Sequence, residues 1–189
     1  MRKLIEKLDT QKNMCCDLKL ELLYQFERRE ISKGEVLIKE GQTPDSLYFV
    51  EDGFMASAIW EDGNRKYTRF WLPGAIVFDH KHLMKQTRAT EHLYAHRDSL
   101  VFVLSIDAIR DNLIKFPEFH YKMRDLADIQ SAEIEEHKNI LRGRFPEKKY
   151  EMFLAYYGDS AREIPIEQIA SFLCISESVL YQVRKSRIH

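Results

Sequence analysis

Residues 31–79 decide the fold, and they read ISKGEVLIKEGQTPDSLYFVEDGFMASAIWEDGNRKYTRFWLPGAIVFD. Short apolar segments alternate with turn residues about every ten positions, a pattern typical of an all-β sandwich or barrel. The Asp-Gly pair within residues 61–64 predicts a hairpin turn, because tight turns need the positive φ angles that these residues accept. Residues 94–105, YAHRDSLVFVLS, close the β region.

Helical patterns flank this β region on both sides. Residues 1–29 carry leucine and isoleucine at helical spacing among charged residues, which predicts helix as far as residue 29. Pro117 suits a first helical turn and Gly143 suits a helix end, so one long helix is predicted between them. Residues 144–189 are predicted to form three shorter helices.

The composition of the 189-residue chain narrows the functional classes. A formal net charge of -1 gives no overall basic field, so any affinity for nucleic acid must come from a local patch. Three cysteines without CxxC spacing give no disulfide framework or zinc knuckle, and they suit a reducing cytosol. No apolar run approaches the ~20 residues that a membrane span needs, so we expect a cytoplasmic protein with no membrane partner.

One stripe of mostly apolar side chains runs the length of the long predicted helix. Its members recur three and four residues apart: Met123, Leu126, Gln130, Ile134, His137 and Leu141. The stripe packs either on the chain's own β domain or on a second copy of the helix as a coiled coil. A helix of this length projects past a small barrel, so we favour a homodimer seam. Gln130 and His137 would fix its register at some cost in stability.

Residues 166–189, IEQIASFLCISESVLYQVRKSRIH, have the pattern of a helix-turn-helix unit. The positions expected to face inward are Ile169, Ala170 and Leu173 on the first helix, Ile175 in the turn, and Val179, Leu180 and Val183 on the second helix. The candidate DNA-binding residues are Ser176, Glu177, Ser178, Tyr181, Gln182, Arg184, Lys185 and Arg187. In such motifs the N-terminal end of the second helix enters the major groove.

The outward residues have chemistry that suits DNA. Ser178 and Gln182 can hydrogen-bond base edges, and Glu177 can accept from a cytosine amino group. The three cations near the C-terminus suit phosphates, and Ser176 is expected to be the N-cap. Two features weaken the motif. Cys174 stands at a turn position where such motifs often have glycine, and residues 142–189 hold eight Lys and Arg against six Asp and Glu.

The order of these parts and the motifs of the β region resemble the CRP/FNR family of bacterial transcription regulators. That family has a glycine after the opening of the first strand and another in the next turn, which Gly34 and Gly41 match. The strand and turn LYFVEDG at 47–53 and the LPG at 72–74 also match. The resemblance covers nearly the whole chain, and the early ending resembles the short members common in Bacteroidetes.

The resemblance implies an α+β fold in three parts. Residues 1–116 would form an N-terminal jelly roll like a cyclic nucleotide-binding domain. Residues 117–143 would form the dimerisation helix, and residues 144–189 a helix-turn-helix DNA-binding domain.

Family members that bind cyclic nucleotides carry a phosphate cassette, in which a Gly-Glu pair precedes an Arg-Ser pair by about ten residues. The Glu accepts the ribose hydroxyl and the Arg offsets the phosphate charge. Here Phe78 and Asp79 stand at the first pair, and Ala89 and Thr90 at the second. Arg88 is one residue early, which on a strand turns it to the opposite face, although a register slip would restore it. The departures of this segment from the family's cassette argue against cyclic AMP as the effector. The effector-binding residues that the resemblance implies are Phe78, Asp79, His80, Arg88, Ala89 and Thr90.

Other cofactors and an enzymatic activity are the minor alternatives. An iron–sulfur sensor needs a cluster of cysteines, and Cys15 and Cys16 are too few. Haem-sensing relatives use a histidine ligand, and the histidines that crowd the cassette are His80, His82, His92 and His96. On strands, His80 and His82 would share a face, but scattered histidines are more often solvated than metal-bound. No motif in the sequence pairs a nucleophile with a base, so we expect that the protein is not an enzyme. The polar cluster DHKH at 79–82 is the place to test for an enzymatic activity.

The sequence therefore predicts a homodimeric transcription regulator. The jelly roll would sense a small effector of unknown identity, and two recognition helices would lie about one DNA turn apart on a near-palindromic site. Effector binding would bias two arrangements about a hinge near Gly143-Arg144. The expected partners are DNA, a second copy, the effector and RNA polymerase. The alternative is a small-molecule sensor with a degenerate DNA domain that acts through a protein partner.

Overall fold

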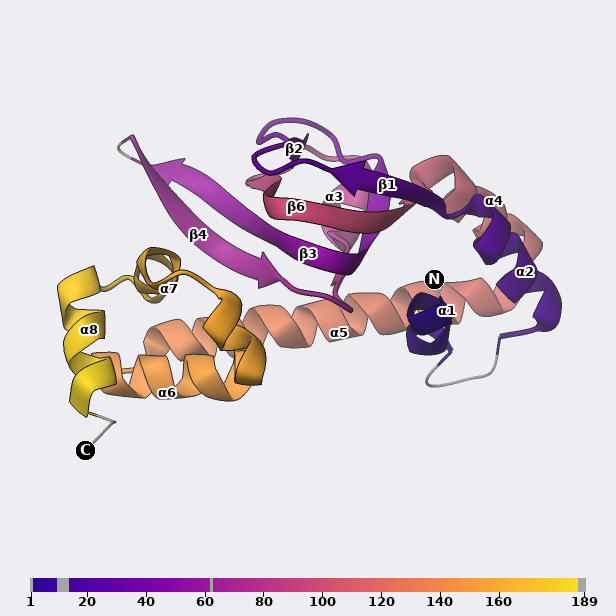
Figure 1. Cartoon of the computed structure of the whole chain (residues 1–189). Helices are drawn as coiled ribbons and strands as arrows, with labels where there is room; N and C mark the ends of the chain where they lie inside the picture. The colour runs from indigo at the N-terminus through magenta and orange to yellow at the C-terminus, as the bar shows by residue number, and fades with distance from the viewer. Residues whose placement is uncertain (1, 10–13, 62, 187–189) are drawn as a thin grey trace. The chain divides into compact units, whose positions relative to one another are not determined.

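The computed structural model describes residues 2–9, 14–61 and 63–186 (Figure 1). Two helices, α1 (Arg2–Leu8) and α2 (Cys16–Gln25), precede the first strand, β1 (Glu27–Ile31). The prediction of helix as far as residue 29 was wrong, because Phe26 leaves the helical backbone with ψ 117°. The next residues pair instead with a distant strand, with Glu27 opposite Val103. Long-range pairing thus overrides the local helical spacing.

The remaining strands are β2 (Val36–Ile38), β3 (Ser46–Glu61), β4 (Asn64–Trp71), β5 (Ile76–Val77) and β6 (His92–Ser105). The main path of the sheet is β1-β6-β3-β4, while β2 pairs with β6 and β5 pairs with β3. The pairings of β1 and β2 with β6, and of β3 with β5, are antiparallel. This arrangement is the jelly roll that the family resemblance implies, and it agrees with the all-β sandwich or barrel that the turn spacing predicts. Residue 62 of the expected hairpin turn lies outside the described residues.

The motif glycine Gly53 has a packing reason to be glycine. Its φ is +104°, and a Cβ built there would lie 2.2 Å from Ser99 Oγ. Any side chain would therefore collide with the neighbouring strand β6. The LYFVEDG motif thus ends where two strands approach closely.

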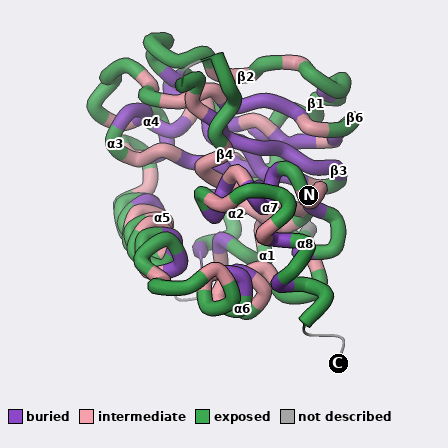
Figure 2. Tube along the Cα trace, turned by 90° about the vertical axis from the view of Figure 1, so that its left-hand side faces the viewer, coloured by how far each residue is buried: buried purple, intermediate pink, exposed green. Residues whose placement is uncertain are grey.

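Helices α1, α2 and α4 pack against strands of the jelly roll. The helix α4 (Ile106–Lys115) begins at Ser105, whose hydroxyl accepts the Ala108 N–H at 3.2 Å. One core cluster joins buried side chains of α1, α2, α4 and the strands, among them Leu4, Leu18, Leu22, Phe49, Leu104 and Ile109. Figure 2 shows strands that are largely buried, whereas α5 and α6 are exposed along one side.

The C-terminal part is helical, as predicted. The helix α5 (Pro117–Arg142) begins at the expected proline, has 26 residues and is followed by Gly143. The helices α6 (Pro146–Tyr157), α7 (Ile166–Leu173) and α8 (Glu177–Ser186) follow, with a 3₁₀ turn at Gly158–Glu163. No helix within the described ranges is long and apolar enough to cross a membrane.

The chain divides into two compact units. The first comprises Met1–Ser57 and Phe70–Gln130, and the second comprises Ala58–Arg69 and Ser131–His189. The far end of the β3–β4 hairpin therefore belongs with the C-terminal helices. The three-part division expected from the sequence stays a prediction, and its hinge at Gly143-Arg144 lies inside the second unit.

Candidate effector and nucleic-acid sites

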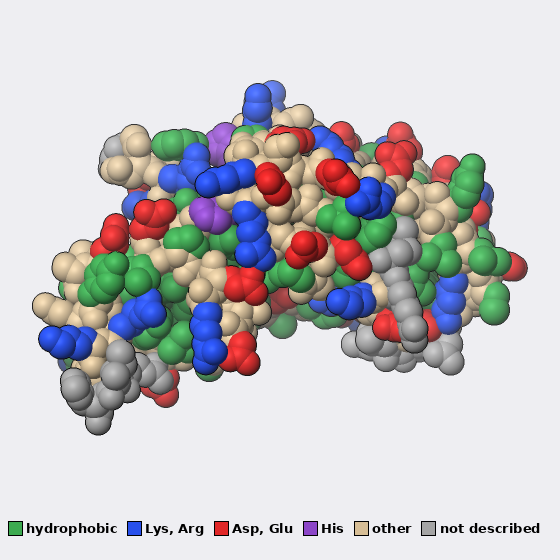
Figure 3. Space-filling view, in the orientation of Figure 1, with side chains coloured by type: hydrophobic (Ala, Val, Ile, Leu, Met, Phe, Trp, Pro, Cys, Tyr) green, Lys and Arg blue, Asp and Glu red, His purple; other side chains and the backbone are tan. Residues whose placement is uncertain are grey.

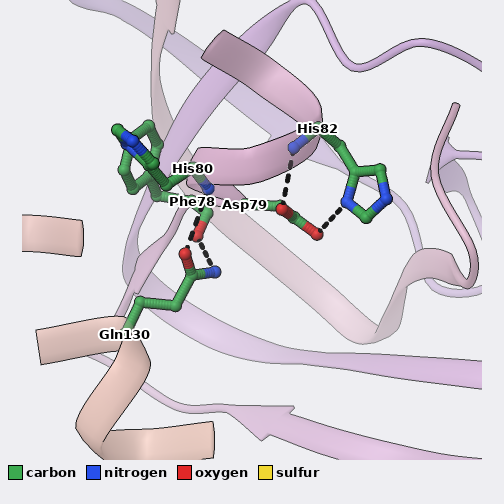
Figure 4. Close-up of polar contacts among 5 residues, drawn as sticks. All are labelled: Phe78, Asp79, His80, His82 and Gln130. Carbon is green, nitrogen blue, oxygen red and sulfur yellow. Dashed lines mark hydrogen bonds and ion pairs between the residues drawn. The ribbon is translucent and has the colours of Figure 1, made fainter. Parts of the chain in front are cut away.

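The turn before the short helix α3 (His80–Lys85) contains the first half of the predicted effector site (Figure 4). Asp79 caps this helix: its Oδ1 accepts the His82 N–H at 3.0 Å, and its Oδ2 lies 2.6 Å from His82 Nδ1. The His82 side chain is buried, as is Phe78. Both carboxylate oxygens of Asp79 are thus engaged within the first turn of α3.

The prediction that His80 and His82 share a face was wrong, because this segment is a helix and not a strand. Residues two apart on a helix point to different sides, and Figure 4 shows the two imidazoles on opposite sides of α3. The His80 ring packs edge-on against Phe78, with centroids 5.6 Å apart. His80 Nδ1 is buried and has no hydrogen-bond partner among the residues that the structure describes.

Gln130 of α5 forms two hydrogen bonds with the backbone of the same turn. Its Oε1 accepts the His80 N–H at 3.0 Å, and its Nε2 donates to the Phe78 carbonyl. Both ends of one amide are therefore bound to backbone groups that flank Asp79. Gln130 was predicted to lie in a dimer seam, and this contact was not predicted, because nothing local in the sequence links residues 78 and 130.

The second half of the predicted site, Arg88 to Thr90, lies in the loop after α3 and not on a strand. The Ala89 N–H donates to the Gln42 carbonyl, and the Ala89 carbonyl accepts the Gly41 N–H, both at 2.8 Å. Arg88 and Thr90 are exposed. Arg88 is therefore not turned to one face by strand alternation, and the role of Arg88 in effector binding stays a prediction. Among the residues that the structure describes, no three His, Cys, Asp or Glu side chains are grouped to hold a metal ion.

The stripe predicted as a dimer seam makes contacts inside the chain along most of its length. Met123 and Leu126 pack on the core of the first unit, and Gln130 binds the turn before α3. His137 is buried, Ile134 is half-buried, and Leu141 is exposed. The alternative, that the stripe packs on the chain's own β domain, holds for its first two members. The dimer contact through this stripe stays a prediction.

His137 lies in an aromatic cluster of the second unit. Its ring centroid is 4.8 Å from that of Tyr156 and 5.4 Å from that of Phe172, and Tyr157 Oη lies 3.4 Å from its Nε2. Burial, aided by the positive charge of Arg69, lowers the pKa of His137 to about 4. The imidazole is therefore neutral at pH 7, and it ties α5 to α6 and α7.

Helices α7 and α8 have the predicted helix-turn-helix arrangement. The inward positions Ile169, Ala170, Leu173, Leu180 and Val183 are buried, and Val179 is half-buried. The turn contains Cys174 in the left-handed conformation, with φ 54° and ψ 47°. Cys174 thus adopts the backbone conformation that a glycine would adopt more easily.

The candidate DNA-binding side chains of α8 point away from this core. Glu177, Ser178, Tyr181, Gln182, Arg184 and Lys185 are all exposed. Ser176 is also exposed, and its Oγ accepts the Val179 N–H at 3.3 Å, so it is the expected N-cap. Arg187 lies outside the described residues. Lys and Arg side chains are interspersed with Asp and Glu over the face seen in Figure 3, which shows no large field of one sign.

Comparison with known proteins shows one matching family model and several solved structures with a similar fold. The family model described as the cyclic nucleotide-binding domain matches residues 28–115. FixK2 from Bradyrhizobium japonicum is similar in structure, with a TM-score of 0.74 and 15% identity over 85% of this chain and 83% of that chain. A comparison with curated proteins finds no match.

Two further solved structures extend the likeness. One is a protein assigned to the CRP/FNR family of transcriptional regulators from Eubacterium rectale, with a TM-score of 0.73 and 12% identity, covering 100% of this chain and 88% of that chain. The other is the c-di-GMP responsive global regulator CLP from Xanthomonas campestris, with a TM-score of 0.70 and 12% identity over 92% and 91% of the two chains.

Residues 28–115 thus match the cyclic nucleotide-binding domain model, and the chain shares its fold with these solved structures of transcription regulators. The resemblance seen in the sequence is confirmed at this level.

Proposed function

We propose that this protein is a homodimeric, DNA-binding transcription regulator of the CRP/FNR type. The observation that carries the proposal is the α7–α8 pair, in which apolar residues face inward while Ser178, Gln182 and Lys185 are exposed. In this role Ser178 and Gln182 bind base edges in the major groove, Glu177 accepts from a cytosine amino group, and the nearby cations bind phosphates. The protein would act in the cytoplasm, with RNA polymerase as a further partner.

The test is selection of binding sites from a randomised DNA library at two salt concentrations. We expect enrichment of a two-fold symmetric site whose affinity falls steeply with salt, because released counterions accompany each phosphate contact. Failure to enrich any site at low salt, with or without cell extract as a source of effector, would contradict the proposal.

The homodimer is proposed to form through α5. Besides the predicted stripe, the same helix has exposed apolar side chains on another face, Tyr121 and Ile129, with exposed fractions of 53% and 44%. Light scattering at micromolar concentration is expected to give twice the chain mass of 22.5 kDa. A monomer at that concentration, with or without DNA, would rule out the dimeric mechanism.

The effector is proposed to be a small molecule other than a cyclic nucleotide. Two observations support this: the carboxylate of Asp79 is engaged by His82, and buried Phe78 stands where the cassette needs a glycine. We expect cyclic AMP, cyclic GMP and c-di-GMP to leave the melting temperature unchanged at millimolar concentration. A rise of several degrees that is lost in Arg88→Ala would show that the cassette still binds a nucleotide phosphate.

A second function is a small-molecule sensor that acts through a protein partner. Its support is the mixed charge of the helix-turn-helix, where Glu167 and Glu177 are both exposed, together with the strained Cys174. If Arg184→Ala with Lys185→Ala leaves regulation in cells unchanged, the partner function would replace DNA binding.

A further inference from the structure

The far end of the β3–β4 hairpin, residues 58–69, belongs to the same compact unit as the helix-turn-helix. Figures 1 and 2 both place this hairpin end beside α7. Strand β4 lies at the edge of the main sheet, so its outward backbone groups lack a neighbouring strand.

One side chain of α7 meets two of these edge groups. Ser171 Oγ donates to the Arg65 carbonyl and accepts the Tyr67 N–H, both at 3.3 Å. Arg65 and Tyr67 are alternate residues of the strand, so the two backbone groups point to the same edge. A single hydroxyl therefore fixes the hairpin end to the first helix of the helix-turn-helix.

The hairpin end carries cations at its surface. The Arg65 guanidinium lies over the ring of Trp60, 5.1 Å from its centroid, and both residues are exposed. Lys66 forms an ion pair with Glu61, and about half of each side chain is exposed. Such a surface ion pair contributes little and is screened by salt, so Lys66 can exchange Glu61 for a phosphate at small cost.

The first helix of a helix-turn-helix crosses the DNA backbone while the second lies in the groove. A segment fixed to α7 is therefore brought to the same backbone. An added phosphate contact would strengthen DNA binding by the helix-turn-helix, because residues 142–189 have a surplus of only two positive charges. They contain eight Lys and Arg against six Asp and Glu.

We propose that the hairpin end is a second DNA contact, in which Arg65 and Lys66 bind phosphates beside the groove that α8 occupies. The inference rests on the proposed function. Trp60 holds the guanidinium of Arg65, and Ser171 positions the strand. Because these contacts reach only phosphates, they add affinity and no sequence preference.

The test measures affinity for the selected DNA site as a function of salt. We expect Arg65→Ala with Lys66→Ala to lower affinity about tenfold at low salt and to reduce the slope of log K against log salt by about 1.8, or ~0.9 per lost phosphate contact. The order of preference among DNA sequences is expected to stay the same. The matched control, Lys39→Ala with Arg110→Ala, removes two exposed charges from the first unit and should change neither quantity.

Two further variants separate DNA contact from a structural effect. Ser171→Ala keeps both cations but releases the strand, so it should weaken binding in the native background and have no effect in the Arg65→Ala, Lys66→Ala background. Glu61→Gln frees Lys66 and should tighten binding about two- to threefold at low salt.

The outcomes distinguish this inference from the function on which it rests. If the unmodified protein binds its site and the double variant keeps the full salt slope, the hairpin contact is overturned while the proposed function stands. If the unmodified protein binds no DNA, both fall.

Discussion

The turn before α3 and the helix pair α7–α8 are the two regions where the sequence predicts contacts with another molecule, and the structure treats them differently. At the turn, Asp79 is engaged by His82, and the flanking backbone groups are bound by Gln130. On α8, side chains such as Ser178 and Gln182 are exposed. The first half of the predicted effector site is therefore closed by the chain's own contacts, while the predicted DNA-binding surface is exposed.

This difference bears on how the proposed effector would bind. A ligand that uses Asp79 or the Phe78 carbonyl has to displace a contact that the protein already makes. Each displaced hydrogen bond lowers the net affinity by about 0.5–1.5 kcal/mol. The proposed contact of α8 with DNA needs no such rearrangement, and we expect its affinity to depend on the few cations of this helix.

The largest effect is expected from acid on the second unit. The pKa of His137 is about 4 in the folded protein and about 6.5 in an unfolded chain. As the pH falls from 7 through 6.5, the unfolded chain binds a proton that the folded protein does not. The free energy of unfolding should therefore decrease by on the order of 2 kcal/mol between pH 7.5 and 5.

Urea unfolding at the two pH values checks this prediction. The variant His137→Phe should lose this part of the pH dependence, whereas His120→Phe, which changes an exposed histidine, should keep it. Equal pH dependence in all three proteins would mean that His137 is not buried in its neutral form.

Removal of cations from α8 tests the open surface. Arg184→Ala with Lys185→Ala should weaken DNA binding by about 2 kcal/mol at low salt and should lower the salt slope by ~0.9 for each lost phosphate contact. Titration of labelled DNA at several salt concentrations provides the measurement. An unchanged slope would show that these cations do not face phosphates.

A substitution of Gln130 tests the turn before α3, which the chain's own contacts close. Gln130→Leu leaves the His80 N–H and the Phe78 carbonyl without their partner, which should cost about 1–3 kcal/mol of stability. Hydrogen exchange at the α3 amides should speed up more than exchange in α7. Ser131→Ala, one residue along the same helix and exposed, is the control. Equal exchange in the two variants would mean that Gln130 does not hold the turn.

The smallest effect concerns the turn of the helix-turn-helix. Cys174 has a φ of 54°, a conformation that costs a non-glycine residue about 1 kcal/mol. Cys174→Gly should therefore stabilise the protein by about 0.5–1 kcal/mol, or raise the melting temperature by a few degrees. A lower melting temperature would contradict the strain assigned to this turn.

Local patterns predicted the elements that depend on local chemistry. The α7–α8 pair follows from helical spacing and from the Ser176 N-cap, and both were correct. Helix α5 likewise begins at Pro117 and is followed by Gly143. The capping residue Asp79 was a local signal for helix α3 that the sequence analysis did not use, so His80 and His82 were assigned to the wrong kind of element.

The features that the sequence did not predict depend on contacts between distant residues. β1 starts at Glu27 because β6 pairs with it, although the local spacing there favours helix. Gln130 binds a turn about fifty positions away, and Ser171 binds a strand about a hundred positions away. In each case a polar group of one segment forms a hydrogen bond with a backbone group of another segment. The spacing of apolar residues within either segment does not reveal which distant segment it pairs with.

The most direct test of the account is whether α8 distinguishes bases. Affinity should be measured for the native protein and for Gln182→Ala, on the selected site and on sites with single base changes. We expect the native protein to lose about 1–3 kcal/mol at an adenine within each half-site, and Gln182→Ala to lose that discrimination at the same position only. If the two proteins show the same profile of base preferences at every position, α8 does not read DNA as proposed.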